Sequence, residues 1–221
     1  GFGVLKAGSN VTGEIADAIL ETELTDQRSL DQVLIDLDGT PDKSRLGANA
    51  ILGVSLAAAR AAAEYRGLPL YRALSSNAHI LPVPLVNLIN GGKHASNDLD
   101  FQEFIILPVG ADSIMEALQI SSEVNLFLAE ILLERYGKVA LNTGDEGGFA
   151  PPISDPHEAL GLLHEAVAAA GYEGRFRYGL DAASTHYYDS DKGTYLVNGV
   201  ERDRDGMIEL YKELIAKYDI V

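Results

Sequence analysis

The acidic residues Glu103, Asp145, Glu146 and Asp181 are the side chains of this sequence whose types and setting best suit chemistry. Asp145 and Glu146 stand between glycines in the segment NTGDEGGFAPP, residues 142–152. Glycine permits backbone angles closed to other residues and lets another chain or a ligand come close, while proline prevents a helix from starting at once. We therefore expect a sharp, rigid loop that projects both carboxylates, although an ordinary solvated acidic turn has a similar composition.

Glu103, Glu146 and Asp181 each lie at or near the end of a predicted strand. If these three acids converge on one mouth of the fold, they suit a hard divalent cation such as magnesium and acid–base catalysis. Where two carboxyl groups lie close together, one of them keeps its proton near neutral pH and can act as an acid. The alternative interpretation is that the three acids are separate surface groups.

The elements that would position these acids follow from hydrophobic periodicity and capping residues. Helices are predicted over 3–20, 27–37, 46–65, 113–136, 155–170 and 205–218. Strands are predicted over 83–89, 101–109, 138–141 and 177–181, followed by a hairpin of 187–188 with 195–197 and the start of a strand at 220–221. The helix over 46–65 is apolar on nearly every side, which predicts the centre of a helical layer.

Two adjacent strands followed by alternating helices and strands predict an α/β fold of parallel units with an antiparallel start. In a barrel of this class the functional groups lie at the carboxyl ends of the strands. The polar candidates fall at such places: Asn90 and His94 after the first strand, Gln102 and Glu103 within the second, and the acids described above.

The composition of the 221 residues excludes several classes of protein. A net charge of −16 repels phosphate backbones and argues against a nucleic-acid partner, whereas a divalent cation would still let a small anionic substrate bind. The chain has no cysteine, which fits a reducing, cytoplasmic compartment. Its longest apolar run, 48–63, is too short and too rich in alanine to span a membrane. Phosphate-loop, dinucleotide and HExxH zinc motifs are absent.

Six segments of the sequence closely resemble the enolase family. They are LDGT at 37–40, LGANAILGVSLA at 46–57, NGG at 90–92 with His94 and Ala95, QEF at 102–104, GDEGG at 144–148 and GLD at 179–181. They occur in the family's order and at its spacing, and the resemblance covers essentially the whole chain. It implies that 1–78 form the helical part of a small α+β N-terminal domain. By the same resemblance, 79–221 form the first half of a catalytic (β/α)8 barrel whose first two strands are antiparallel.

The resemblance also implies a function, the magnesium-dependent interconversion of 2-phosphoglycerate and phosphoenolpyruvate in glycolysis and gluconeogenesis. Glu146 resembles the family's acid for the departing hydroxyl, with Glu103 beside it. Asp181 resembles the first of three carboxylate ligands of the tightly bound Mg²⁺. His94 and Gln102, together with Glu103, resemble substrate-contacting groups, and Asp145 is expected to hold the loop in shape. A homodimer or higher homo-oligomer is inherited from the family as an expectation.

The sequence departs from the family at both ends. The family's N-terminal strands, its remaining metal ligands and its lysine base have no counterpart among the 221 residues, so we expect a partial chain that is inactive alone. Two other hypotheses stay open. The chain could be a non-catalytic binding or structural protein on the same scaffold, or a relative that acts on another carboxylate substrate. Intact Glu103, Glu146 and Asp181 favour the enzyme.

Overall fold

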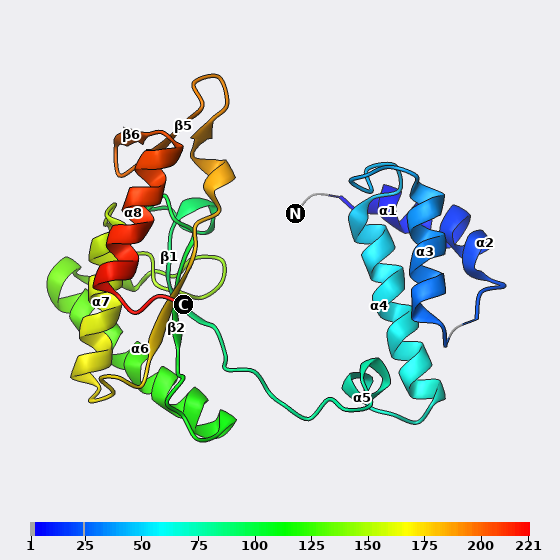
Figure 1. Ribbon diagram of the computed structural model, residues 1–221, viewed down its shortest axis with the longest axis horizontal. Helices are drawn as coiled ribbons and strands as arrows, with labels where there is room; N and C mark the ends of the chain where they lie inside the picture. Colours follow the sequence, from blue (N-terminus) through cyan, green and yellow to red (C-terminus); the bar gives the residue numbers. More distant parts are fainter. Residues whose placement is uncertain (1–2, 24) are drawn as a thin grey trace. The chain divides into compact units, whose positions relative to one another are not determined.

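A computed structural model of the protein describes residues 3–23 and 25–221, so Gly1, Phe2 and Leu24 lie outside the described residues. The chain divides into two compact units, Gly1–Ile80 and Leu81–Val221, and each is described by itself (Figure 1). None of the described helices is both long and apolar enough to cross a membrane.

The first unit consists of helices. They are α1 (Leu5–Asn10), a π-helical turn (Val11–Ile15), α2 (Ala16–Ile19), α3 (Gln27–Asp38), α4 (Ala48–Tyr65) and α5 (Leu70–Leu74). The single helix predicted over 3–20 is thus broken into three pieces. Its break lies at Gly13, whose φ of −108° and ψ of −108° are not helical, and glycine accepts such angles most readily.

Helix α4 packs through one face, although its sequence is apolar on nearly every side. Its core residues Ala50, Ile51 and Val54 join Leu30 and Leu34 of α3 in one hydrophobic cluster. Leu52 and Leu56, on another face of the same helix, are exposed. Hydrophobic periodicity shows which faces can be buried but not which neighbours cover them, and within this unit α4 contacts α1, α3, α5 and the π-helical turn.

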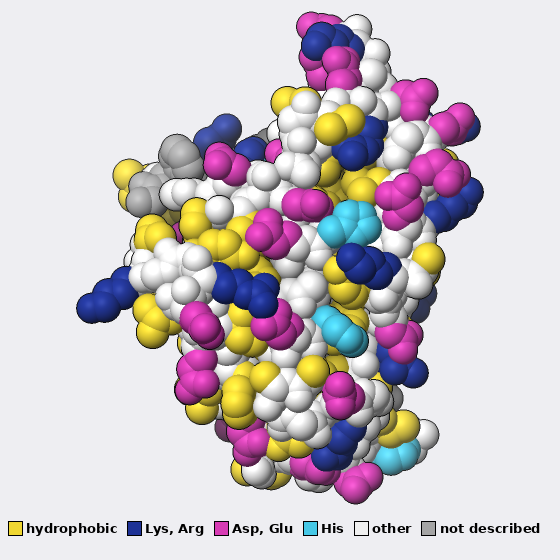
Figure 2. Space-filling model, turned by 90° about the vertical axis from the view of Figure 1, so that its left-hand side faces the viewer, with side chains coloured by type: hydrophobic (Ala, Val, Ile, Leu, Met, Phe, Trp, Pro, Cys, Tyr) yellow, Lys and Arg dark blue, Asp and Glu magenta, His cyan; other side chains and the backbone are white. Residues whose placement is uncertain are grey.

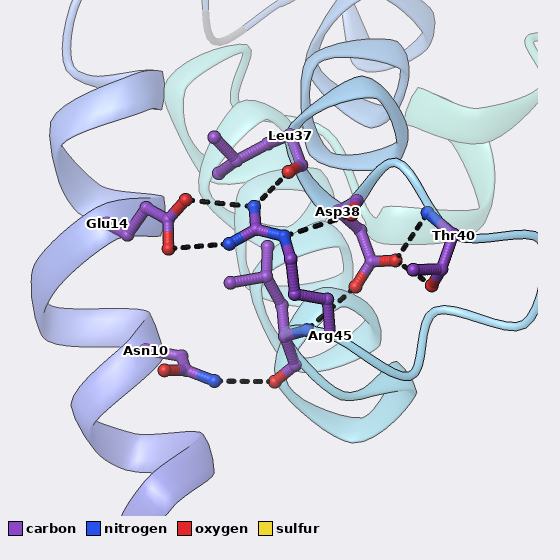
Figure 3. A network of polar contacts seen from close by, with 7 residues as sticks. Asn10, Glu14, Leu37, Asp38, Thr40 and Arg45 are labelled. Atoms are coloured by element: carbon purple, nitrogen blue, oxygen red, sulfur yellow. Dashed lines mark hydrogen bonds and ion pairs between the residues drawn. The ribbon is translucent and has the colours of Figure 1, made fainter.

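A polar network closes the turn between α3 and α4 (Figure 3). The buried Asp38 carboxylate accepts hydrogen bonds from the backbone N–H groups of Leu46, at 2.8 Å, and Thr40, at 3.0 Å. Arg45 donates to the Asp38 carbonyl at 3.0 Å and to Glu14 at 3.0 Å. Burial acts to raise the pKa of Asp38, but these hydrogen bonds together with the Arg45 charge outweigh it and lower that pKa. The turn predicted after α3 is therefore held by the charged form of Asp38.

The second unit is built on a three-stranded sheet. Its strands are β1 (Val86–Asn90), β2 (Glu103–Leu107) and β3 (Arg177–Asp181), in the order β1-β2-β3 and with both pairs antiparallel. Helices α6 (Ile114–Tyr136), α7 (Pro156–Ala169) and α8 (Arg204–Lys217) contribute to the same hydrophobic core as the sheet. A second small sheet joins β4 (Tyr188–Asp189), β5 (Thr194–Val197) and β6 (Val200–Arg202). The predicted hairpin is confirmed, with β6 as an additional strand.

The helix starts agree with the capping residues in the sequence. Ser113 accepts a hydrogen bond from the N–H of Glu116 at 3.1 Å, and the Glu116 side chain accepts one from the N–H of Asp112 at 2.7 Å. Asp155 caps α7 through the N–H of His157 at 2.8 Å. These bonds satisfy backbone donors that have no partner within the first turn of a helix.

Acidic side chains are spread over the face seen in Figure 2 instead of gathering in one patch.

The predicted strand over 138–141 is wrong. Helix α6 ends at Gly137, whose φ of 74° suits glycine, and Lys138–Leu141 continue as a 3-10 turn with Ala140 fully buried. A short apolar run fits a buried turn as well as a strand, so its pattern does not discriminate between them. Parallel pairing in this unit is confined to single bridges, Ile89 with Phe149 and Tyr178 with Ile220. Over the described residues the strands do not close into a barrel.

Leu128 of α6 offers a test of this core, because its side chain is fully buried among the sheet and helices. We expect Leu128→Ala to lower the free energy of unfolding by about 2–5 kcal/mol through lost burial and a residual cavity. Urea unfolding followed by circular dichroism measures the change. Leu126→Ala on the exposed side of the same helix should shift the free energy of unfolding by less than about 0.5 kcal/mol, and equal losses in both variants would contradict this packing.

Candidate active site

The reversed direction of β2 brings the ends of three strands to one edge of the sheet. Glu103, the first residue of β2, is the cross-strand partner both of Asn90, the last residue of β1, and of Asp181, the last residue of β3. The Gln102 amide donates to Asp181 Oδ2 at 3.0 Å, and the N–H of Ala183 donates to Asp181 Oδ1 at 3.0 Å. Both oxygens of Asp181 are thus oriented before any ligand arrives.

The glycine-rich loop lies directly on the end of β1. The Asn90 N–H donates to the Phe149 carbonyl at 2.8 Å, and the Phe149 N–H donates to the Leu88 carbonyl at 2.8 Å. The Asp145 N–H donates to the His94 carbonyl at 2.9 Å. The loop is therefore anchored to β1 and to the turn that carries His94, as the predicted rigid loop requires.

Two glycines of the loop are required by this close approach. A Cβ added to Gly144 would lie 2.4 Å from the His94 carbonyl oxygen, and one added to Gly148 would lie 2.5 Å from Asn90 Oδ1. Atoms cannot approach so closely, so any larger residue would push the loop away from β1. The predicted close approach is confirmed, and it is made by the protein's own backbone and Asn90.

His94, Glu103 and Glu146 face one another above the sheet edge. His94 Nδ1 lies 3.4 Å from Glu146 Oε1 and 3.9 Å from Glu103 Oε1, and one ligand atom from each residue lies within 4.8 Å of the other two. The exposed fractions of the side chains are 17% for Glu103, 26% for His94 and 42% for Glu146. The structure thus brings together three of the predicted site residues, while Asp181 and Gln102 lie beside them on the same edge.

The two glutamates share their protons unequally. The adjacent Glu146 carboxylate, which accepts a hydrogen bond from protonated Glu103, raises the pKa of Glu103 to about 7, and burial and the charges of Glu146 and Asp181 act in the same direction. The same hydrogen bond lowers the pKa of Glu146, aided by His94 and by Asn87 and opposed by burial. At neutral pH, therefore, Glu103 is protonated in a large fraction of the molecules, whereas Glu146 is ionised.

Asn87 was missed as a site residue. Its amide Nδ2 donates to Glu146 Oε2 at 3.2 Å, which leaves Oε1 turned toward His94. The one feature of the sequence that could have indicated Asn87 is that it is the single amide in the otherwise apolar strand predicted over 83–89. Asp145, in contrast, is exposed and holds the loop through its backbone N–H, and its side chain makes no hydrogen bond within 3–23 and 25–221.

A strand edge that carries two close glutamates, a facing histidine and a neighbouring aspartate is suited to acid–base chemistry. Comparison with known proteins agrees. The chain matches the family Enolase, N-terminal domain, over residues 1–74, and the family Enolase, C-terminal TIM barrel domain, over residues 78–221. The chain therefore belongs to the enolase family, as a partial enolase with its two domain types.

Curated relatives named Enolase support the same assignment. One from Methanocaldococcus jannaschii is 52% identical over 222 residues. Relatives from Methanococcus maripaludis and Thermococcus kodakarensis are each 50% identical, over 222 and 224 residues. The alignments cover 100% of this chain and 52% of each relative, so the chain spans about half the length of the curated relatives it matches.

We expect Gly144→Ala to destabilise the site, because its methyl group would meet the His94 carbonyl. The overpacking should lower the free energy of unfolding, measured with urea, by about 1–3 kcal/mol. Gly147→Asn is the matched control, since Gly147 has a φ of 84° but open space around its Cβ position, and asparagine tolerates such angles. A smaller loss in Gly144→Ala than in Gly147→Asn would contradict the described contact.

The raised pKa of Glu103 predicts a pH dependence of stability. The ordinary pKa of a glutamate is 4.5, and that of Glu103 in the folded chain is about 7. Between these two pH values the folded chain keeps a proton on Glu103 that the unfolded chain loses. The contribution of Glu103 to the free energy of unfolding therefore falls as the pH rises through this range. Chemical unfolding at several pH values should show this slope reduced in Glu103→Gln and retained in Asp145→Asn. Carbon-13 NMR of the Glu103 carboxyl group should titrate near 7, and a midpoint near 4.5 would refute the assignment.

Proposed function

We propose that the chain is part of an enzyme, a carbon–oxygen lyase that dehydrates 2-phospho-D-glycerate to phosphoenolpyruvate in glycolysis and runs the reverse reaction in gluconeogenesis. The observation that carries the proposal is the close pair of Glu103 and Glu146 facing His94, in which the pKa of Glu103 is raised and that of Glu146 is lowered. Membership of the enolase family and relatives named Enolase support it. We further propose a cytoplasmic homodimer, with 1–78 in the N-terminal domain and 79–221 in the catalytic barrel.

The reaction requires removal of a weakly acidic proton from carbon beside a carboxylate, and then loss of hydroxide. Hydroxide is a poor leaving group, so it needs a proton donor. Glu146 is proposed to face the departing hydroxyl, with Glu103 as the neighbour that holds the shared proton at neutral pH. The proton passes from Glu103 to Glu146 and on to the hydroxyl oxygen, which leaves as water. Enolase-superfamily sites use a lysine or histidine base, and no residue of this chain is proposed for that role.

Magnesium is the proposed cofactor, and Asp181 is its proposed ligand. The carboxylate suits a hard cation that prefers oxygen ligands. Each of its oxygens accepts one hydrogen bond, from Gln102 and from the Ala183 N–H, and keeps a further lone pair for a ligand. Bound there, the ion would draw negative charge from the substrate carboxylate and make the neighbouring C–H more acidic. A single carboxylate does not hold Mg²⁺ firmly, so we propose that the 221 residues alone are inactive.

His94 and Gln102, with Glu103, are proposed to contact the substrate. His94 stands on the turn Gly92–His94 immediately above the glutamate pair. Gln102 precedes β2, and its bond to Asp181 ties its amide to the proposed metal ligand. The alternative is a non-catalytic binding or structural protein on this scaffold. Such a protein would have no need to hold two carboxyl groups together at a cost to its stability. The glutamate pair therefore favours the enzyme.

Substitution of the proposed acid tests the function in the complete enzyme. We expect Glu146→Gln to abolish dehydration, because the amide cannot pass a proton to the hydroxyl. Exchange of the substrate's carbon-bound proton with deuterated solvent, followed by NMR, should largely survive, since a different group removes that proton.

Asp145→Asn is the matched control, because it removes one negative charge from the same loop and keeps the backbone bond to His94. Both dehydration and exchange should persist in this control. Equal loss of dehydration and exchange in Glu146→Gln would assign Glu146 a different role.

A further inference from the structure

We propose that Asn198, in the turn between β5 and β6, is a site of spontaneous deamidation and that Ser154 assists the reaction. Asparagine followed by glycine is especially prone to this reaction, because glycine has no side chain to shield its backbone nitrogen. The sequence contains the pair at Asn90-Gly91 and at Asn198-Gly199. The two pairs lie in opposite surroundings, so the fold decides which of them reacts. The reaction is independent of the proposed function.

The reaction has two steps, and water is the only other reactant. The backbone nitrogen of Gly199 attacks Cγ of Asn198, and a new C–N bond forms. The side-chain nitrogen then leaves as ammonia, carrying the proton that the backbone nitrogen gives up. Water opens the resulting cyclic imide at one of its two carbonyl groups. The product is aspartate or isoaspartate, and no atom is oxidised or reduced.

The hairpin presents the Asn198-Gly199 pair to solvent. The two residues form the turn between β5 and β6, in which Val197 pairs with Val200. Both have a positive φ, 51° for Asn198 and 68° for Gly199, and both are exposed. Asparagine and glycine are the residues that such a turn favours. Exposure lets water reach the amide and lets ammonia leave, so the turn that selects this pair also makes it reactive.

Ser154 is placed to activate the amide of Asn198. Its hydroxyl donates a hydrogen bond to Asn198 Oδ1 at 2.7 Å. Attack on Cγ turns this oxygen into an oxyanion, and a donor that is already in place stabilises the developing charge. The backbone is held as well, since the Asn198 N–H donates to Asp100 Oδ2 at 2.7 Å. The reacting amide is therefore both oriented and polarised.

The Asn90-Gly91 pair is protected by packing. Asn90 is fully buried, and the Gly91 N–H donates to the Gln102 carbonyl at 2.9 Å. A nitrogen engaged in this bond is not free to attack. A Cβ added to Gly91 would lie 2.4 Å from the Phe101 carbonyl oxygen, so the backbone there has no room to change its conformation. We therefore expect this pair to react only when the chain unfolds.

Deamidation would place a new negative charge next to existing acids. Asp100 binds the backbone of the turn, and both Asp98 and Asp100 line one hollow with Asn198. A carboxylate formed at 198 would be repelled by that of Asp100. Isoaspartate would also add a carbon atom to the backbone of the turn and disturb the pairing of Val197 with Val200. The modified hairpin should therefore be held less firmly to the segment that precedes β2.

Incubation of the full chain at mildly alkaline pH, followed by peptide mapping with mass spectrometry, tests the site. Heavy-oxygen water labels each residue that has reacted, and isoaspartyl methyltransferase detects the isoaspartate. Because a buried strand end opens only rarely, modification at Asn198 should exceed that at Asn90 by at least about 10-fold in the folded chain. In urea both pairs should react at similar rates, since each follows a β-branched residue, Ile89 or Val197.

Ser154→Ala tests the assistance by the hydroxyl. It should slow deamidation of Asn198 about fivefold, which corresponds to a loss of about 1 kcal/mol of stabilisation in the transition state. Ser190→Ala is the matched control, because Ser190 is exposed at the tip of the neighbouring β4–β5 hairpin and should leave the rate unchanged. Circular dichroism verifies that both variants fold.

The possible outcomes separate the two parts of the proposal. Equal modification of Asn90 and Asn198 in the folded chain, a preference for Asn90, or modification of neither would overturn the site. An unchanged or faster rate in Ser154→Ala would overturn the assistance by Ser154. A rate lowered equally by Ser190→Ala would do the same, because it would show that the hydroxyl at 154 has no specific part.

Discussion

The antiparallel direction of β2 is the constraint on which the site depends. If β2 ran parallel to its neighbours, Glu103 would lie at the opposite edge of the sheet from Asn90 and Asp181. Because β2 is reversed, its first residue meets the last residues of β1 and β3. Acidic groups from segments far apart in the sequence are thereby brought to one edge, and the hydrophobic core formed with α6, α7 and α8 keeps that edge in place.

The loop over 142–150 adds the fourth segment by approaching the backbone of β1 directly. Gly144 and Gly148 have no room for a side chain, and the bonds between Asn90, Phe149 and Leu88 leave the loop one way to dock. Glu146 is then held between the Asn87 amide and His94. The local backbone of the loop thus determines where the Glu146 carboxylate lies relative to residues that are distant in the sequence.

Much of this could be predicted from the sequence where the signal is local. The predicted helix starts at Ser113 and Asp155 agree with the structure, because the backbone N–H groups that bind these caps follow within one turn. The strand predicted at 138–141 failed because a short buried turn and a strand have the same apolar pattern. The exposed side of α4 was also unpredictable, since periodicity does not say which neighbour covers a face.

For the candidate site, too, the residues with a local signal could be predicted, whereas the contacts between distant segments could not. Glu103, Glu146 and His94 could be picked out by residue type and by resemblance to a family. The unequal environments of the two glutamates could not, because they arise from burial and from contacts between segments more than forty residues apart. Asn87 was overlooked for this reason, since only the folded chain shows that its amide meets Glu146.

The unequal exposure of the two glutamates has a consequence for how the pair exchanges protons with solvent. Glu146 is 42% exposed and borders solvent, whereas Glu103 is 17% exposed and lies behind it. A carboxylate in contact with bulk water exchanges protons with it directly, while a shielded one does so through its neighbour. Glu146 therefore connects the shielded Glu103 to the solvent, and Glu103 can gain or lose its proton without any opening of the sheet edge that holds it.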